Sequence, residues 1–181
     1  MRSPGRDELA GAYGRSVPDL VGPRMRVLLV GINPSLWSGW SGFHFGRPSN
    51  RLWATLHGAG LTERRLRPEE TEALLAAGIG ITNLVDRATA RADELAAEEI
   101  RAGVPRLRVL VRRWHPPHVA VLGVTAYRLA FAQPRAGVGP RPEPFEGARL
   151  WVLPNPSGLN AHYQQVELTA AYAALGAASQ A

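Results

Sequence analysis

Four short apolar segments recur along the chain, and longer segments with helical periodicity lie between them. The apolar segments are rich in Val, Ile and Leu, which is typical of strands buried on both faces, and they span residues 25–32, 79–85, 118–123 and 150–153. The clearest helical pattern repeats an apolar residue every third or fourth position, at Ile100, Val104, Leu107, Val111 and Trp114. This alternation predicts an α/β fold, a three-layer α/β/α sandwich around a short, mainly parallel sheet of four strands.

Turn-forming residues mark the limits of these segments. Residues 1–24 are rich in Gly and Pro and predict an N-terminal arm, which leaves residues 25–181 as a single domain. We expect the long helix to begin at Asp93 and to kink or split at Pro105, because proline lacks the N–H that continues a helix. Residues 133–149, rich in Pro, Gly and Arg, predict a flexible excursion.

Two unusual turns follow the first and the last predicted strand, GINPS at 31–35 and NPSGLN at 155–160. Ligands of open parallel sheets bind beyond the carboxyl ends of the strands, because the connecting loops gather there. The sequence therefore places the candidate functional site at these two turns.

The absence of two residue types narrows the chemistry. The chain has no cysteine, which excludes disulfides, thiolate nucleophiles and iron–sulfur clusters. It also has no lysine, since all 21 basic residues are arginine, so a P-loop and a lysine Schiff base are excluded. No histidine spacing resembles a metal site, and we expect neither a metal nor another cofactor.

The net charge of +6 favours a polyanionic partner such as nucleic acid. No apolar run approaches the roughly 20 residues of a membrane-spanning helix, and the N-terminus lacks the apolar stretch of a signal peptide. We therefore expect a cytoplasmic protein with no membrane partner. A monomer is expected as well, because no extended apolar stripe is left unassigned.

Four separated motifs now bear on function, and they stand in order at residues 31–35 (GINPS), 42–53 (GFHFGRPSNRLW), 83–89 (NLVDRAT) and 152–159 (VLPNPSGL). Together they resemble the mismatch-specific uracil/thymine DNA glycosylase family over residues 25–175. The resemblance implies an α/β/α sandwich without metal or redox cofactor. It also implies excision of uracil, with thymine or other damaged pyrimidines as further candidates, opposite guanine in duplex DNA. Without a lysine nucleophile the enzyme is expected to be a monofunctional hydrolase.

Two residues are the catalytic candidates. The resemblance implies that Asn33 positions the attacking water, which an amide can orient but cannot deprotonate. The alternative is an Asn-Pro turn whose side chain caps the backbone. Asp93 follows the second predicted strand, so its carboxylate could serve as the general base or offset positive charge on the sugar. It could equally be the N-cap of the long helix, and the two hypotheses stay open.

The resemblance also supplies a substrate-binding set. Phe45 matches the ring that stacks on the flipped base, the alternative being a core aromatic. Ser38 falls near C5 of the pyrimidine, and Asn83 is placed against the base edge. Ile32 and Asn155 complete the predicted set.

Two features of the chain depart from the family. Trp37 and Trp40 stand where small residues are usual, which leaves open the size of the pocket and the acceptance of thymine. The basic residue usual after the intercalating leucine is replaced by Asn160, which leaves open how the opposite guanine is recognised.

The predicted DNA-binding loop contains Ser157, Gly158, Leu159 and Asn160. An apolar side chain at a polar loop tip suits a wedge that fills the gap left by a flipped base, and Gly158 allows the backbone to approach DNA closely. The alternative is that Leu159 folds inward against the following helix.

Two other functions remain open. The first is a non-catalytic nucleotide- or DNA-binding module on a similar sheet, which the charge and the loop would fit. The second is a broader uracil glycosylase that also acts on single strands. Release of uracil separates the first from an enzyme, and a panel of substrates separates the second.

Overall fold

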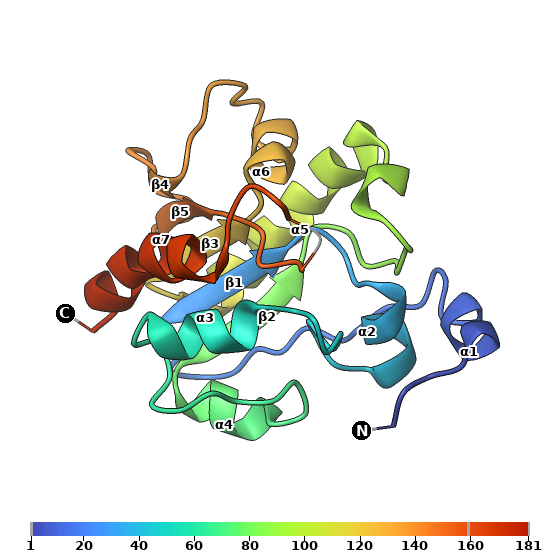
Figure 1. Cartoon of the computed structure of the whole chain (residues 1–181). Helices are drawn as coiled ribbons and strands as arrows, with labels where there is room; N and C mark the ends of the chain where they lie inside the picture. The colour runs from blue at the N-terminus through green and yellow to red at the C-terminus, as the bar shows by residue number, and fades with distance from the viewer. Residues whose placement is uncertain (1, 159, 181) are drawn as a thin grey trace.

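The computed structural model describes residues 2–158 and 160–180, so the candidate wedge Leu159 lies outside the described residues. Its centre is a five-stranded sheet in the order β2-β1-β3-β5-β4 (Figure 1). All neighbouring strands are parallel except β4, which pairs antiparallel with β5. The strands are β1 (Val27–Gly31), β2 (Ile79–Asn83), β3 (His118–Leu122), β4 (Gly139–Pro140) and β5 (Arg149–Leu153).

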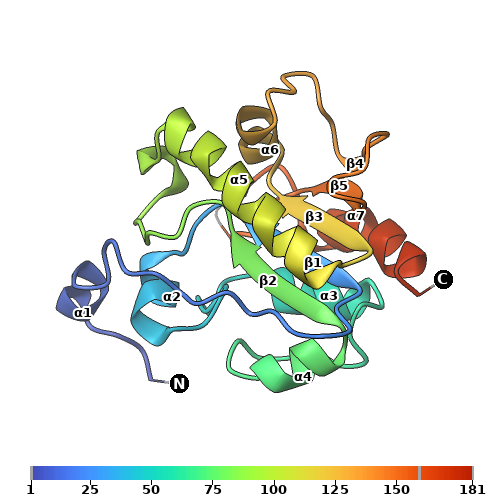
Figure 2. The ribbon, with the colours of Figure 1, turned by 180° about the vertical axis from the view of Figure 1, so that it is seen from behind.

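Helices cover both faces of this sheet, which confirms the predicted α/β/α sandwich. Figure 1 shows α3 and α7 in front of the sheet, and Figure 2 shows α5 crossing its back with α6 beside it. The helices are α1 (Arg6–Ala10), α2 (Leu36–Ser41), α3 (Leu52–Gly58), α4 (Thr71–Ala76), α5 (Ala97–Trp114), α6 (Val124–Ala130) and α7 (Gln165–Ala178). None of the helices in the described part of the chain is long and apolar enough to cross a membrane.

Successive residues of each strand point to opposite layers, as the pleat of a strand requires. Leu28 and Val30 of β1 join the cluster under α5 and α6, whereas Val27 and Leu29 join the cluster under α3 and α7. All four side chains are fully buried. A strand with an apolar layer on each side must be apolar at every position, which explains why the parallel strands were recognisable as continuous apolar runs.

The fifth strand was not predicted. β4 has only two residues and lies in the segment 133–149, which the composition had indicated as a flexible excursion. Most of its residues are exposed, but its end packs on the domain: Phe145 is 6% exposed and meets the ring of Phe131 edge to face, and it pairs with Ala148 in an isolated bridge. Tertiary contacts thus order a segment whose composition favours loops.

Two predictions about the long helix were wrong. First, α5 begins at Ala97 with Ala96 as its N-cap, whereas Asp93 lies in a separate 3₁₀ turn (Ala92–Glu94). Second, the helix continues through Pro105 and is not split there, while a kink at Pro105 stays a prediction. Proline removes one hydrogen bond, to the carbonyl four residues earlier, and Pro105 is exposed, so water can satisfy that carbonyl.

The segment before β1 packs along the sheet. Leu20 forms an antiparallel bridge with Ile81 in β2, and Ala12 and Val17 are buried. The helices α1 and α2 lie beside one another, away from the α3 and α7 layer (Figures 1 and 2). The boundary at residue 24 between arm and domain stays a prediction.

Candidate active site

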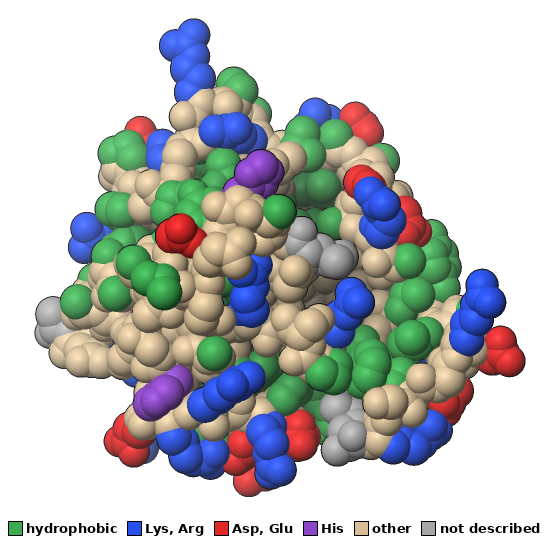
Figure 3. All heavy atoms as spheres, in the orientation of Figure 1, with side chains coloured by type: hydrophobic (Ala, Val, Ile, Leu, Met, Phe, Trp, Pro, Cys, Tyr) green, Lys and Arg blue, Asp and Glu red, His purple; other side chains and the backbone are tan. Residues whose placement is uncertain are grey.

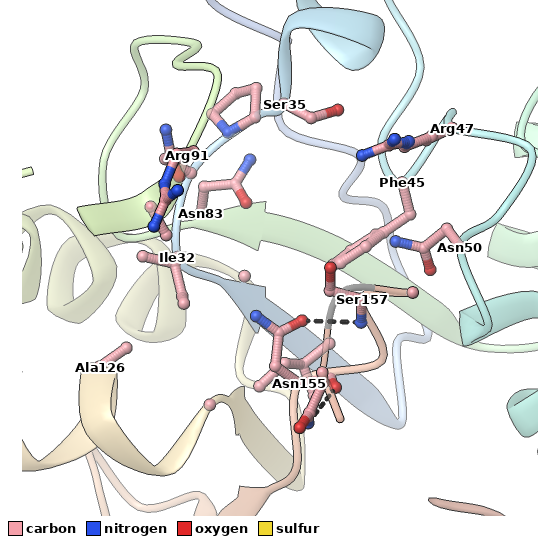
Figure 4. A pocket seen from close by; sticks show the side chains of 18 of the residues that line it. Ile32, Ser35, Phe45, Arg47, Asn50, Asn83, Arg91, Ala126, Asn155 and Ser157 are labelled. Carbon is pink, nitrogen blue, oxygen red and sulfur yellow. Dashed lines mark hydrogen bonds between the residues drawn. The ribbon is translucent and has the colours of Figure 1, made fainter. Parts of the chain in front are cut away.

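A cleft of about 940 Å³ opens where the loops after the parallel strands meet. Its lining includes every predicted site residue that the structure describes, namely Ile32, Asn33, Ser38, Phe45, Asn83, Asp93, Asn155, Ser157, Gly158 and Asn160. These residues come from four loops far apart in sequence, and the sheet brings them together because the carboxyl ends of parallel strands share one edge. Figure 4 shows Ile32, Asn83, Phe45 and Asn155 around this common space.

The amide of Asn33 is held by two hydrogen bonds. Its Nδ2 donates to the backbone oxygen of Arg87 over 3.0 Å and to Oγ1 of Thr89 over 2.7 Å. The hydroxyl of Thr89 in turn donates to the backbone oxygen of Arg91 over 2.7 Å, so it can only accept from Asn33. Both amide protons are thereby used, and Oδ1 is left as an acceptor with no donor among the described residues. This geometry suits a group that orients a water through that oxygen.

Thr89 was missed as a site residue, although it lies in the motif at 83–89. It is 2% exposed and lines the cleft. A threonine at the end of a loop carries no sequence signal for a side-chain hydrogen bond to a residue 56 positions earlier, and only the fold supplies that contact.

Asp93 lies at the exposed rim of the cleft. Its side chain is 62% exposed, and both carboxylate oxygens accept from the guanidinium of Arg91, at 3.0 and 3.1 Å from Nε and 2.5 Å from Nη2. The hydrogen bond from Arg91 lowers the pKa of Asp93 below its ordinary value. A lower pKa keeps the carboxylate charged and makes it a weaker base. Its position does not match the helix cap that the sequence left open.

The backbone of Phe45 is held in a left-handed conformation, with φ of 50°. Such a conformation costs roughly 1–2 kcal/mol for a residue with a Cβ, so it needs support. Two side chains provide it: the indole Nε1 of Trp53 donates to the backbone oxygen of Phe45 over 3.2 Å, and the backbone N–H of Gly46 donates to the hydroxyl of Ser38 over 3.3 Å. The buried Ser38 thus anchors the turn that presents the phenyl ring to the cleft (Figure 4).

Asn83 occupies the wall of the cleft at the end of β2. Its Nδ2 lies 3.4 Å from Nδ1 of His44, and Nε2 of His44 donates to the backbone oxygen of Pro18 over 2.9 Å. A carbonyl only accepts, so the proton of the neutral ring sits on Nε2 and Nδ1 is free to accept from Asn83. Burial lowers the pKa of His44, which favours this neutral form. The ring of His44 therefore sets which way the amide of Asn83 faces.

The backbone of Gly31 forms the floor beside Asn83. A Cβ at this position would lie 2.3 Å from Oδ1 of Asn83 and 3.2 Å from Cζ of Phe45. Glycine is therefore required here by close approach, because the amide oxygen of Asn83 occupies the place that a Cβ would take.

The two tryptophans that depart from the family pattern do not line the cleft. Trp37 and Trp40 lie on α2 with their rings 6.0 Å apart and edge to face. Arg2 stacks on Trp40, so this ring packs between α2 and the N-terminal segment. Trp37 borders the turn at Gly46, where its Cδ1 would lie 3.3 Å from a Cβ.

The β5–α7 loop, described at residues 154–158 and 160–164, is closed by its own side chains. Oδ1 of Asn155 accepts from the backbone N–H of Ser157 over 3.0 Å, and Nδ2 of Asn160 donates to the backbone oxygen of Asn155 over 2.9 Å (Figure 4). Gly158 lies against the opposite loop, since a Cβ there would be 2.7 Å from the backbone oxygen of Ser49. The predicted DNA-binding loop is therefore a folded rim of the cleft.

Basic side chains are spread over the face that carries the cleft and alternate with acidic ones (Figure 3). Within the described part of the chain, no three side chains of His, Cys, Asp and Glu lie close enough to hold a metal ion.

With this geometry in place, comparisons with known proteins assign the chain to a family. The model of the uracil DNA glycosylase superfamily matches residues 18–176. The chain belongs to this superfamily. Members hydrolyse the N-glycosidic bond of a base in DNA, so membership supports DNA glycosylase activity with uracil-containing DNA as the partner.

A solved structure supports the same fold. The solution NMR structure of a candidate uracil DNA glycosylase from Methanosarcina acetivorans matches with a TM-score of 0.63 and 19% sequence identity. The match covers 90% of this chain and 98% of the other. At this identity the likeness shows the fold alone.

Proposed function

We propose that the protein is a monofunctional, mismatch-specific glycosylase that excises uracil opposite guanine from duplex DNA, with thymine as a second candidate base. The observation that carries the proposal is the arrangement of Asn33, Phe45 and Asn83 around one cleft in a chain of this superfamily. They offer a water-orienting oxygen, a ring to stack on and an amide for a base edge.

The chemistry requires the base to leave the stack and enter the cleft. A water oxygen then bonds to C1′ of the sugar as the bond from C1′ to N1 of the base breaks. The electron pair of the broken bond stays with the base, and the proton that the water loses passes through solvent to the departing base. Oδ1 of Asn33 would accept a hydrogen bond from this water and fix its direction of attack, because the amide protons are already bound to Arg87 and Thr89.

Phe45 and Asn83 are proposed to bind the flipped pyrimidine. The ring of Phe45 would stack on its face. The carboxamide of Asn83, oriented by His44, would offer Oδ1 to the N3–H of uracil. Ile32, Ser38 and Asn155 line the same space and would complete the pocket.

Asp93 keeps a proposed role that fits its charge. Held as an anion by Arg91, it would offset the positive charge that develops on the sugar. The general-base hypothesis makes a different prediction, and Asp93→Asn separates the two. A slower Asp93→Asn enzyme that keeps the solvent deuterium isotope effect of wild type supports charge stabilisation, whereas loss of that isotope effect supports proton abstraction.

The deciding experiment is release of uracil from a duplex with a single G·U pair, with enzyme in excess. Wild type is expected to release uracil, and Asn33→Ala is expected to lose about 10²-fold or more of the rate, as when a positioned polar group is removed. Equal rates for wild type and Asn33→Ala would contradict the proposed role of Asn33 in orienting the water. No release by wild type would favour the non-catalytic binding module.

Substrate specificity is tested with the same assay. Parallel duplexes carrying A·U and G·T pairs, and a single strand carrying uracil, measure preference for the opposite base and for the duplex. Faster release from G·U than from A·U and from the single strand is expected. Equal rates would replace the mismatch-specific assignment with a broad uracil glycosylase.

A further inference from the structure

Arg51, the residue before α3, reaches the β5–α7 loop more than 100 positions later in the chain. Its Nη1 donates to the backbone oxygen of Tyr163 over 2.5 Å, and its Nη2 donates to those of Ser157 and Asn160 over 2.6 and 2.9 Å. Its backbone N–H also donates to the oxygen of Pro156 over 3.0 Å. One residue therefore binds four carbonyl groups of the loop.

The charge of Arg51 has no acidic partner among the residues that the structure describes. The ion pairs of the described chain all involve other arginines. The side chain is partly buried, and its Nε is fully buried without a hydrogen-bond partner. Burying a guanidinium without an acidic partner is costly. Here the hydrogen bonds to three loop carbonyls offset part of that cost, so the buried charge is tied to this loop.

The contacts also define what the loop presents to solvent. Carbonyl oxygens that turn toward Arg51 are withdrawn from the outer side of the loop, where they would repel a phosphate. The positive charge beneath them adds an attractive field. A planar guanidinium with several donors can span three acceptors at once, which a lysine ammonium on a flexible stem cannot do as well.

We propose that Arg51 is the positioning residue that holds the β5–α7 loop in the shape that binds duplex DNA. The inference rests on the proposed function, because that loop is assigned to DNA only there. Arg51 itself does not line the cleft, so it acts through the loop and not on the reacting atoms.

The test is a single-turnover titration on the G·U duplex, which separates the half-saturating concentration from the maximal rate. Arg51→Gln is expected to raise the half-saturating concentration about 10-fold or more, equal to about 1.4 kcal/mol, with a maximal rate within about threefold of wild type. The half-saturating concentration of Arg51→Lys is expected to lie between those of wild type and Arg51→Gln. If Arg51 had a purely structural role, Arg51→Gln would lower the melting temperature without raising the half-saturating concentration at a nearly unchanged maximal rate.

Two matched variants separate position from charge. Arg64→Gln removes one positive charge from an exposed residue paired with Glu70, outside the cleft, and is expected to leave both constants unchanged. Gly158→Ala leaves the charge unchanged but pushes the loop off Ser49, and is expected to raise the half-saturating concentration as Arg51→Gln does. If Arg51→Gln does not fold, Arg51→Lys decides through the same two constants.

Several outcomes would overturn the inference. A half-saturating concentration for Arg51→Gln equal to that of wild type or of Arg64→Gln removes the positioning role, as does a drop in maximal rate alone. A failure of the proposed function is distinguishable, because wild type would then release no uracil. Binding of the same variants to a duplex with a stable abasic-site analogue, followed by fluorescence anisotropy, would still test Arg51 in that case.

Discussion

The hydroxyl of Thr89 is the support of Asn33 that can be removed with the least change of shape. Thr89→Val keeps the volume but deletes the acceptor of the 2.7 Å bond from Nδ2 of Asn33 and the donor to the backbone oxygen of Arg91. A net hydrogen bond contributes about 0.5–1.5 kcal/mol, and each 1.4 kcal/mol is about tenfold in rate. If the lost bond lets the amide of Asn33 rotate, excision is expected to slow roughly three- to tenfold.

The assay is single-turnover release of uracil from the G·U duplex at saturating enzyme, so that product release does not hide the chemical step. Thr89→Ser keeps the hydroxyl and is expected to stay within about twofold of the wild-type rate. Loss of the two hydrogen bonds of the Thr89 hydroxyl should also lower the free energy of unfolding by about 1–3 kcal/mol. A Thr89→Val enzyme that is less stable but excises uracil at the wild-type rate would refute the reasoning, because Asn33 would then not depend on this contact.

Three further predictions concern close approach and protonation. Gly31→Ala puts a Cβ 2.3 Å from Oδ1 of Asn83, and we expect excision to fall about tenfold or more, measured in the same assay. Burial lowers the pKa of His44 below 6.5, so the stability that its neutral ring provides is present above pH 6.5 and is lost as the pH falls through the folded-state pKa. Thermal unfolding of wild type from pH 8 to 5 should show this loss, and His44→Gln should show less of it. Gly103→Ala puts a Cβ 2.1 Å from the backbone oxygen of Leu84, and the overpacking of about 1–3 kcal/mol should exceed the gain in helix propensity of about 1 kcal/mol, so the melting temperature should fall.

The positions of the parallel strands could be predicted from the sequence. A parallel strand is buried on both faces, so its residues form a continuous apolar run. Three of the four predicted segments contain an observed parallel strand, and the fourth covers all of β5 except Arg149. The two-residue β4 gave no such signal, because a strand that short is formed by its pairing with β5 and not by its own side chains.

The prediction that α5 begins at Asp93 was wrong for a local reason. Asp93 has the residue type of an N-cap, but Arg91 two residues earlier binds its carboxylate, and a 3₁₀ turn separates it from the helix. An exposed ion pair contributes about 0–1 kcal/mol and an N-cap about 0.5–2 kcal/mol, so residue type alone could not decide between a cap and a carboxylate outside the helix.

By itself the sequence determined the four parallel strands, the two turns that carry Asn33 and Asn155, and the superfamily, because apolar periodicity and short motifs are local properties of the chain. Only the tertiary structure decided which protons of Asn33 are used, which way His44 turns Asn83, and that Arg51 supports the β5–α7 loop. Those contacts join residues 39 to 112 positions apart. Hydrogen bonds of that range depend on how the layers pack, and no pattern along the chain encodes their distances or directions.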